Sequence, residues 1–249
     1  MDDLVSQALK SIPRLDEIIE KVWKDLNLKV EYVRNNFSQV LLKFDEKATE
    51  VFVDFEKQAL MSLTQKWIND NKSRVDRLKN TFSKDNIEVF VKELASIFVD
   101  FAFVVQRFEK NAGNMRKARG GKTFEKVIRR LLTHLGIPAE IPTGKDKEEL
   151  KRIDIVIPSI KVAKEKRDKA IFLTCKRTLR ERWKQELPQI LPNTRFYLLT
   201  LDDNFPISKA KEIQEKGLYA YIRDDVYNKI TNKYSLRPLS DLPKDLTFI

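Results

Sequence analysis

Hydrophobic side chains in the first part of the chain recur every three or four positions. This spacing is typical of helices that bury one face. From Arg14 to Ala112 no glycine or proline interrupts the pattern, and Asn69-Asp70-Asn71 is the most favourable place for a turn. A further hydrophobic stripe begins at Ile87. The pattern predicts a helical domain, which either packs on itself and on the rest of the chain or also offers a surface for a dimer.

Beyond residue 112 the pattern changes to short β-branched runs between helical segments. Two helices, over Thr123–Leu135 and Ser208–Lys216, are expected to end at the glycines that follow them. A strand, a helix and a further apolar strand imply a parallel crossover in a mixed sheet. The tail from Tyr234 onward is expected to be irregular. The expected strands are Arg152–Pro158, Ala170–Cys175, Phe196–Leu201 and Leu218–Ile222.

The first two of these strands are expected to form a hairpin. A charged stretch joins them, and its centre at Lys164, Glu165 and Lys166 is the natural tip. Antiparallel pairing around this tip would place Asp154 roughly across from Lys176. The sequence therefore predicts that an acid and a lysine share one end of a small sheet.

Composition changes near residue 112. All six glycines and eight of the nine prolines lie after this position. Residues 1–112 hold 18 Lys and Arg against 19 Asp and Glu, whereas residues 113–249 hold 30 against 18. Independent shifts at one point predict a domain boundary. We expect a helical domain over residues 1–112, for assembly and dimer support, and a second domain over 113–249 that carries the chemistry.

The formal charge of +11 indicates a polyanionic partner, and the excess lies in the second domain. A single cysteine excludes an internal disulfide and argues against a zinc site. No signal peptide and no apolar run of bilayer length is recognisable. We therefore expect a soluble, cytoplasmic protein without a membrane partner.

Residues 114–122 combine basic side chains with a glycine pair ahead of a helix. Loop glycines let a phosphate approach backbone amides, and the lysines and arginines would add positive charge. An ordinary helix entry has the same composition. The candidate contacts to the DNA backbone are Arg116, Lys117, Arg119 and Lys122.

Asp154 and Lys176 are the candidates for phosphodiester hydrolysis. This reaction needs a hard cation that neutralises the phosphate and activates water, and carboxylate oxygens hold such a cation. Asp154 interrupts an apolar strand, where a charge without a partner is costly. Lys176 would orient the attacking water and stabilise charge on the phosphorane. A structural ion pair across the hairpin is the alternative.

Two glutamates are candidates to complete a metal site. Glu125 lies in the first turn of an expected helix, where an acid also stabilises the helix dipole. Glu186 follows Lys176 by ten positions on the next expected helix, where it is equally compatible with a solvated charge. The candidate metal ligands are Asp154, Glu186 and Glu125, and Mg²⁺ is the cation that suits their oxygens.

Arg180, Glu181 and Arg182 follow directly on the strand that ends in Lys176. At the start of a helix that enters the major groove end-on, all three can face base edges. Arginine pairs bidentately with guanine, and glutamate accepts a hydrogen bond from cytosine N4, so the trio suits adjacent G·C pairs. Surface charges around a buried Trp183 are the alternative.

Three motifs in the second domain resemble the PD-(D/E)XK nucleases. The resemblance is greatest to type II restriction endonucleases of the branch that reads CCGG, CCNGG and CCWGG, the EcoRII-like and BsaWI-like enzymes. It covers roughly residues 113–230 and leaves the helical first part without a matching motif. The motifs are Ala118–Glu125, Arg152–Val156 and Cys175–Trp183.

This resemblance implies catalytic roles for Asp154 and Lys176 and makes Glu125 the helix acid of the site. It also implies that the trio 180–182 reads the paired G·C steps.

The chain departs from the family at the remaining acid. Many members carry an acid two residues before the lysine, where this chain has Thr174. In this branch the acid commonly comes thirteen positions after the lysine, where this chain has Gln189. Glu186 is therefore the preferred relocated acid.

These observations predict an α/β (α+β) protein with a restriction-endonuclease-like mixed β-sheet core flanked by helices, preceded by an all-α N-terminal domain. The predicted activity is Mg²⁺-dependent hydrolysis of double-stranded DNA at a short palindrome containing CC and GG, by a homodimer or higher homo-oligomer of a restriction-modification system. CCGG is favoured, and CCNGG and CCWGG are also compatible. Two alternatives stay open: a structure-selective repair or junction nuclease of the same fold, and a non-cleaving DNA-binding module with an incomplete metal site.

Overall fold

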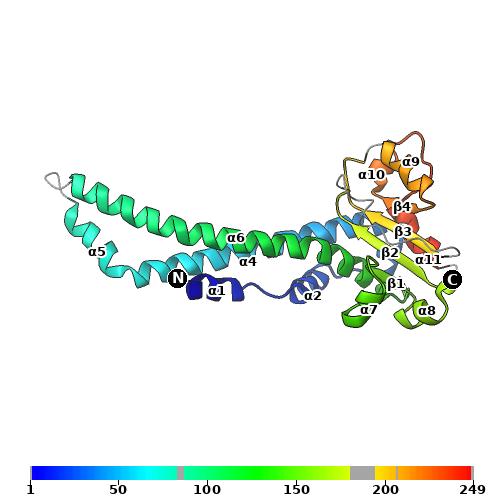
Figure 1. Ribbon diagram of the computed structural model, residues 1–249, viewed down its shortest axis with the longest axis horizontal. Coiled ribbons are helices and arrows are strands. Elements are labelled where there is room, and N and C mark those ends of the chain that lie inside the picture. Colours follow the sequence, from blue (N-terminus) through cyan, green and yellow to red (C-terminus); the bar gives the residue numbers. More distant parts are fainter. Residues whose placement is uncertain (1, 83–86, 180–193, 206, 248–249) are drawn as a thin grey trace. The chain divides into compact units, whose positions relative to one another are not determined.

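The computed structural model describes residues 2–82, 87–179, 194–205 and 207–247 (Figure 1). The chain forms two compact units. Unit 1 comprises Met1–Glu20 and Ala48–Arg119, and unit 2 comprises Lys21–Lys47 and Gly120–Ile249. Helices α2 (Leu15–Leu26), α4 (Phe37–Asp70) and α6 (Ile87–His134) contribute residues to both units.

Unit 1 is helical, as the hydrophobic spacing predicts. It contains α1 (Asp2–Lys10) and α5 (Lys72–Thr81) besides the shared helices. The predicted turn at residues 69–71 is confirmed, because α4 ends at Asp70 and the Asn71 side-chain amide donates to the Trp67 carbonyl at 2.9 Å. The hydrophobic stripe that begins at Ile87 lies on α6. The buried side chains of this unit include Val5, Ala8, Phe52, Leu63, Val104 and Phe108.

The helical part of unit 2 gathers around Trp23. Its indole lies 6.1 Å from the Phe44 ring and 4.8 Å from the His134 ring, centroid to centroid. The guanidinium of Arg130 stacks over the same indole at 4.7 Å. Parts of α2, α4 and α6 therefore pack within this unit, and the short α3 (Val30–Asn35) joins α2 to α4.

In the described part of unit 2, five strands form one mixed sheet in the order β1-β2-β3-β4-β5. The first pair is antiparallel and the others are parallel. Helix α9 (Ile207–Glu215) joins β3 to β4, so the predicted parallel crossover is confirmed. The strands are β1 (Ile155–Ile157), β2 (Ile171–Lys176), β3 (Arg195–Thr200), β4 (Tyr219–Ile222) and β5 (Leu236–Pro238).

Both faces of this sheet are buried, which explains why its strands are almost continuously apolar. On one face Val156, Phe172 and Leu198 share a core with the short helices. Figure 1 shows α8 (Ile160–Glu165) beside β1. Helix α9 lies beside β4, and α10 (Asp224–Tyr227) lies beside β5. The predicted fold class, a mixed sheet flanked by helices, is confirmed.

The expected glycine loop over residues 114–122 is wrong. Helix α6 continues through this segment, both glycines included, and ends only at His134, and Gly136 beyond it takes a φ of +80°. Glycine costs about 1 kcal/mol relative to alanine inside a helix, and neighbouring side chains that bury their apolar parts outweigh this cost. The predicted boundary at 112/113 falls inside this continuous helix, and the division of the chain into domains stays a prediction.

The expected hairpin tip is also wrong, although the two strands do pair antiparallel. The connection folds into α8 and a 3₁₀ turn (Arg167–Lys169), and the Ser159 hydroxyl caps α8 by accepting from the Val162 amide at 3.3 Å. Ile155 pairs with Leu173, which differs by two residues from the predicted register. Pairing two strands symmetrically about the centre of their connection is valid only for a simple hairpin turn. Because this connection contains a helix, symmetry about Glu165 gave the wrong partner for Asp154.

The C-terminal tail is not irregular. It supplies β5, a 3₁₀ turn (Leu239–Asp241) and α11 (Leu242–Leu246). The buried Tyr221 hydroxyl on β4 donates to the Asp245 carboxylate at 2.6 Å, and the Arg237 guanidinium binds the same group at 3.0 Å. The tail therefore closes one edge of the sheet. No helix in the described ranges has an apolar stretch long enough to cross a bilayer.

We expect Tyr221→Phe to lower the free energy of unfolding by about 1.5–3 kcal/mol, because a hydrogen bond to a charged group is lost while the ring stays in place. Chemical denaturation measures this change. Tyr234→Phe is the control, since Tyr234 is exposed. Equal stability of both variants would show that the tail contact contributes nothing.

Candidate functional site

Asp154 lies directly before β1 and is bound to β2 by three hydrogen bonds. Its amide donates to the Leu173 carbonyl at 2.9 Å. Its carboxylate accepts from the Cys175 amide at 2.7 Å and from the Thr174 hydroxyl at 3.4 Å. These bonds hold the carboxylate beside the end of the strand that carries Lys176.

The pairing register also sets the direction of these side chains. Asp154 precedes Ile155, which pairs with Leu173, so Asp154 stands opposite Thr174 and diagonal to Lys176. Side chains alternate between the faces of a sheet, so all three lie on one face. The register differs from the predicted one by an even number of residues, and the acid and the lysine therefore keep the same side.

Glu125 joins this site from helix α6. The pKa of Glu125 is raised to about 7, chiefly by burial and then by the negative charge of Asp154, while Lys147, Lys176 and Lys122 act in the opposite direction. Burial also raises the pKa of Asp154, against the Cys175 amide and the charges of Lys176 and Lys147. Two carboxyl groups from different elements therefore oppose each other's ionisation.

Such a carboxylate pair fits a hard cation, because a positive ion between the oxygens would replace their repulsion by attraction. Glu125 and Asp154 would supply two oxygen ligands. Within the described ranges no three His, Cys, Asp or Glu residues gather in a group that could hold a metal. The predicted third ligand, Glu186, lies outside the described residues, as does Gln189.

Cys175 takes no part in this donor set. The residue is 6% exposed, and burial raises the pKa of its thiol well above the usual value. The thiol therefore stays neutral and packs as a small apolar group.

Lys147 on α7 (Gly144–Glu149) is a site residue that the sequence analysis missed. Its charge lowers the pKa of both Glu125 and Asp154, as that of Lys176 does. It belongs to an ordinary charged run, and no motif distinguishes it from its neighbours. Only the folded chain brings this second lysine within electrostatic range of the carboxylates.

Arg177 follows Lys176 and binds the Asp45 carboxylate on α4. Asp45 is 5% exposed. Burial raises the pKa of Asp45, and the Arg177 guanidinium lowers it through charge and hydrogen bonding. A side chain on Gly120 of α6 would lie 3.7 Å from the same guanidinium. The residue after the catalytic lysine candidate is therefore fixed to the helical part of unit 2.

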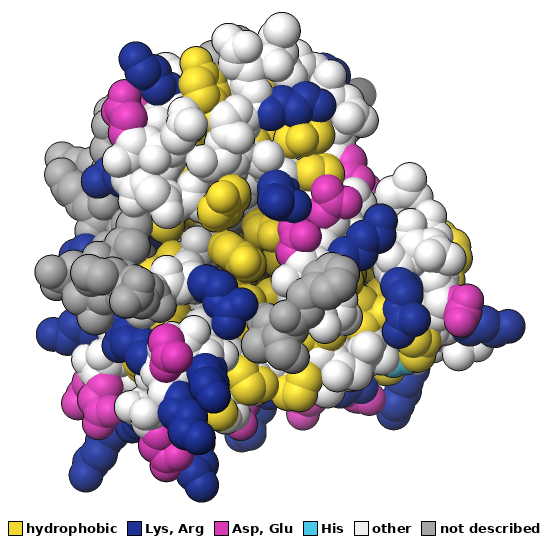
Figure 2. Space-filling model, turned by 90° about the vertical axis from the view of Figure 1, so that its right-hand side faces the viewer, with side chains coloured by type: hydrophobic (Ala, Val, Ile, Leu, Met, Phe, Trp, Pro, Cys, Tyr) yellow, Lys and Arg dark blue, Asp and Glu magenta, His cyan; other side chains and the backbone are white. Residues whose placement is uncertain are grey.

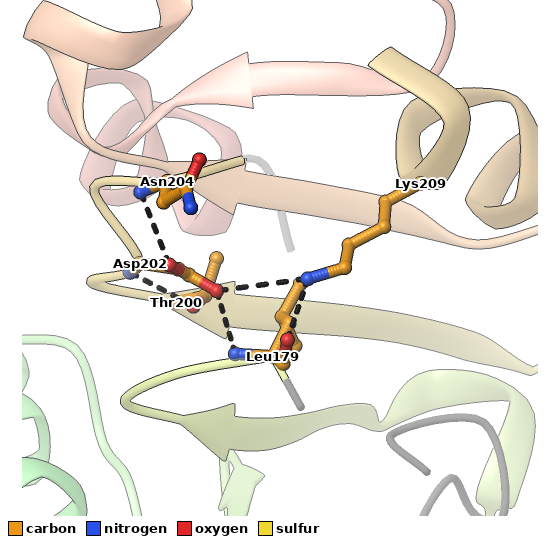
Figure 3. A network of polar contacts seen from close by, with 5 residues as sticks. All are labelled: Leu179, Thr200, Asp202, Asn204 and Lys209. Atoms are coloured by element: carbon orange, nitrogen blue, oxygen red, sulfur yellow. Dashed lines mark hydrogen bonds and ion pairs between the residues drawn. The ribbon is translucent and has the colours of Figure 1, made fainter. Parts of the chain in front are cut away.

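Leu179 is the last described residue before the predicted base-reading trio. Arg180, Glu181 and Arg182 lie outside the described residues. Figure 3 shows that the Leu179 backbone is held by two side chains of the β3–α9 region. Its amide donates to the Asp202 carboxylate at 2.7 Å, and its carbonyl accepts from the Lys209 ammonium at 2.5 Å.

The predicted DNA-backbone residues divide into two pairs. Arg116 forms ion pairs with Glu56 and Glu109 at 3.1 and 2.8 Å, so its charge is largely satisfied within unit 1. Arg119 donates to the Pro13 carbonyl at 2.8 Å and stacks over the Phe52 ring. The second pair, Lys117 and Lys122, is exposed. All four remain predictions as DNA contacts.

On the face of the molecule that Figure 2 shows, the density of basic side chains does not mark out a DNA-binding surface. On the face drawn in Figure 2, lysines and arginines are spread among acidic and apolar side chains. The arrangement of Glu125, Asp154 and Lys176 is therefore the more informative feature of unit 2.

Comparison with known proteins places the chain in a family. Residues 70–237 match the family described as EcoRII C terminal. The type II restriction enzyme SsoII of Shigella sonnei is 28% identical over 184 residues, which cover 70% of this chain and 56% of SsoII. The chain thus spans a little over half the length of this curated relative.

Two solved structures share the fold. Metal-depleted Ecl18kI in complex with uncleaved DNA has a TM-score of 0.70 and 23% sequence identity. The match covers 99% of this chain and 82% of the Ecl18kI chain. The complex of restriction endonuclease PspGI with substrate DNA has a TM-score of 0.66 and 23% sequence identity. The match covers 97% of this chain and 94% of the PspGI chain. The mixed sheet and its helices are therefore a restriction-endonuclease-like fold.

We expect the unfolding free energy of the metal-free protein to fall as pH rises from about 4.5 to about 7. The native pKa of Glu125 is about 7 and its ordinary value is 4.5. Between these values the native state binds more protons than the unfolded state, and its stability decreases with pH.

Glu125→Gln should weaken this dependence between pH 4.5 and 7, and the raised pKa of Asp154 leaves a smaller dependence of the same sign. Thermal unfolding in the presence of a chelator, over a series of pH values, measures it. Glu148→Gln, which neutralises an exposed glutamate on α7, is the matched control. Parallel curves for the unmodified chain and Glu125→Gln would contradict the assigned burial of this carboxyl group.

Proposed function

The chain belongs to the EcoRII C-terminal family, and on this premise we propose that it is a type II restriction endonuclease that hydrolyses phosphodiester bonds in double-stranded DNA. The observation that carries the proposal is the grouping of Glu125, Asp154 and Lys176 in one electrostatic site from α6, the start of β1 and the end of β2. Two carboxylates with an adjacent ammonium are suited to phosphate chemistry assisted by a divalent cation.

The proposed cation is Mg²⁺, held by Asp154 and Glu125 and completed by Glu186. When bound, such an ion neutralises phosphate charge and lowers the pKa of a coordinated water. The Asp154 carboxylate keeps its orientation through Oδ2, which accepts from the Cys175 amide, and its other oxygen is the proposed metal ligand. The Lys176 ammonium, on the same face, would orient the attacking water and stabilise negative charge on the phosphorane.

Sequence reading is proposed for Arg180, Glu181 and Arg182. Their residue types match the major-groove edges of adjacent G·C pairs, and they begin four residues after Lys176. We propose a palindrome containing CC and GG, with CCGG favoured and CCNGG or CCWGG also compatible. A palindrome is read by a two-fold assembly, so the proposed active form is a homodimer.

Exposed apolar side chains on α6 support a second copy of the chain as the partner of unit 1. Ile87, Val91 and Phe98 are 48%, 54% and 63% exposed. Their spacing places them on one face of the helix. Large apolar groups gathered on one face are typical of surfaces that another chain covers.

A non-cleaving DNA-binding module is the second candidate. Thr174 stands where many relatives of this fold carry an acid, and its hydroxyl donates to Asp154 rather than offering a metal ligand. Incubation of plasmid DNA with the protein and Mg²⁺ distinguishes the two candidates. Discrete fragments with a common end sequence support the endonuclease, cutting governed by DNA shape supports a structure-selective nuclease, and intact plasmid supports the binder.

We expect Lys176→Ala to reduce the rate of cleavage roughly 100-fold or more, because the water would lose its orienting group and the transition state its positive charge. Binding to the same duplex, followed by fluorescence anisotropy with Ca²⁺ in place of Mg²⁺, should stay within about 3-fold. Lys169→Ala, in the 3₁₀ turn before β2, is the control, since Lys169 is exposed. Full cleavage by Lys176→Ala would remove this residue from the proposed site.

For the dimer, we expect the unmodified chain to sediment as two copies and the double variant Val91→Ser with Phe98→Ser to sediment as one. Both side chains are more than half exposed, so their replacement spares the core. Val30→Ser removes an exposed apolar group from unit 2 and should leave the mass unchanged. A dimer that survives the double variant would place the interface elsewhere.

A further inference from the structure

Residues 177–179 form a linker between the proposed catalytic lysine and the proposed reading trio. Lys176 ends β2, and Arg180 begins the trio. The orientation of one functional group relative to the other therefore depends on the backbone of these residues. Each end of the linker is bound to a different element of unit 2.

The first end is held by Arg177. Its guanidinium binds the buried Asp45 carboxylate on α4. The Arg177 side chain is 37% exposed and that of Asp45 is 7% exposed, so the ion pair is partly shielded from water. A shielded charge pair restricts the position of its backbone more strongly than a surface pair does.

The second end is held by Asp202, which follows β3. One carboxylate oxygen of Asp202 accepts from the Leu179 amide at 2.7 Å, and the other accepts from the Asn204 amide at 3.1 Å. The Asp202 amide donates to the Thr200 hydroxyl at 3.1 Å. Asp202 is 7% exposed, and these contacts fix its carboxylate (Figure 3).

Lys209 on α9 completes this second attachment. Its ammonium donates to the Leu179 carbonyl at 2.5 Å and lies 3.9 Å from the Asp202 carboxylate. Leu179 itself is 4% exposed. Both polar groups of its peptide backbone are thus bound by charged side chains, which form stronger hydrogen bonds than neutral groups do.

We propose that Asp202 and Lys209 are positioning residues that set the direction in which the chain leaves Leu179, and so hold the reading trio in register with Lys176. The proposal rests on the proposed function and deepens it, because it assigns to these two residues the coupling between base recognition and cleavage. Asp202 and Lys209 touch neither DNA nor metal in this role. They act through the Leu179 backbone.

A purely structural role for this network predicts a different result. Loss of an ion pair that only stabilises the fold would lower the unfolding temperature and the amount of active enzyme, and would leave the preference between DNA sites unchanged. Loss of positioning lowers that preference itself. The preference between sites is therefore the decisive measurement.

The experiment compares Lys209→Met with the unmodified enzyme. Methionine keeps the unbranched stem and removes the ammonium. Cleavage with Mg²⁺ is followed on a duplex with the site identified from plasmid fragment ends, and on duplexes with one G·C pair replaced. We expect the ratio of kcat/KM values, identified site over substituted site, to fall at least about 10-fold.

Matched variants separate the causes. Lys211→Met removes a lysine from the same helix whose side chain is 67% exposed, and the ratio should not change. Lys209→Arg should restore part of the ratio, since a guanidinium can donate to the same carbonyl. Asp202→Asn is the second disrupting variant, in case Lys209→Met does not fold.

A double-mutant cycle tests whether Lys209 acts through the trio. If it does, Lys209→Met should change the ratio by less than about 2-fold in an Arg182→Ala background. Additive effects would overturn the proposal, as would an unchanged ratio in both disrupting variants or failure of both to fold. An unmodified chain that cuts no DNA refutes the proposed function instead, and this outcome is seen before any variant is compared.

Discussion

The hydrogen bond from the Cys175 amide to the Asp154 carboxylate joins the two strands on which the whole site depends. It lies at the end of the antiparallel pair β1–β2, one residue before Lys176. Through this bond, the backbone of β2 holds the Asp154 carboxylate next to Lys176, which is the following residue of the same strand. The remaining groups of the site are added around this pair by α6 and α7.

This arrangement opposes stability and suits the proposed binding of a divalent cation. Glu125 and Asp154 are partly buried near each other, and both have raised pKa values because burial disfavours their charged forms. A fold selected only for stability would not keep two such carboxyl groups together. The nearby lysines reduce the repulsion without removing it, which leaves an electrostatic environment suited to a divalent cation.

The register of the β1–β2 pair shows how far sequence reasoning reaches. Symmetry about Glu165 placed Asp154 opposite Lys176, whereas the structure places it opposite Thr174. The face was right because strand side chains alternate with a period of two and the register differs by two. The partner was wrong because the connection folds into α8, whose path does not follow from the charges of its residues. Similarly, helix-forming neighbours outweigh the glycines near residue 120. The hydrogen bond between Tyr221 and Asp245 holds the C-terminal tail against the sheet, although the prolines of this tail suggested irregular structure.

The amino-acid sequence by itself determined the helical nature of the first part, the alternation of strand and helix in the second, and the residue types that suit phosphate chemistry. These features follow from local periodicity and from the chemistry of single side chains. Only the tertiary structure decided that Lys147 lies within electrostatic range of the carboxylates, that Arg177 binds Asp45, and that Asp202 and Lys209 hold Leu179. These contacts join residues far apart in sequence, and no local pattern encodes them, because the path of the chain between them sets which charged groups meet.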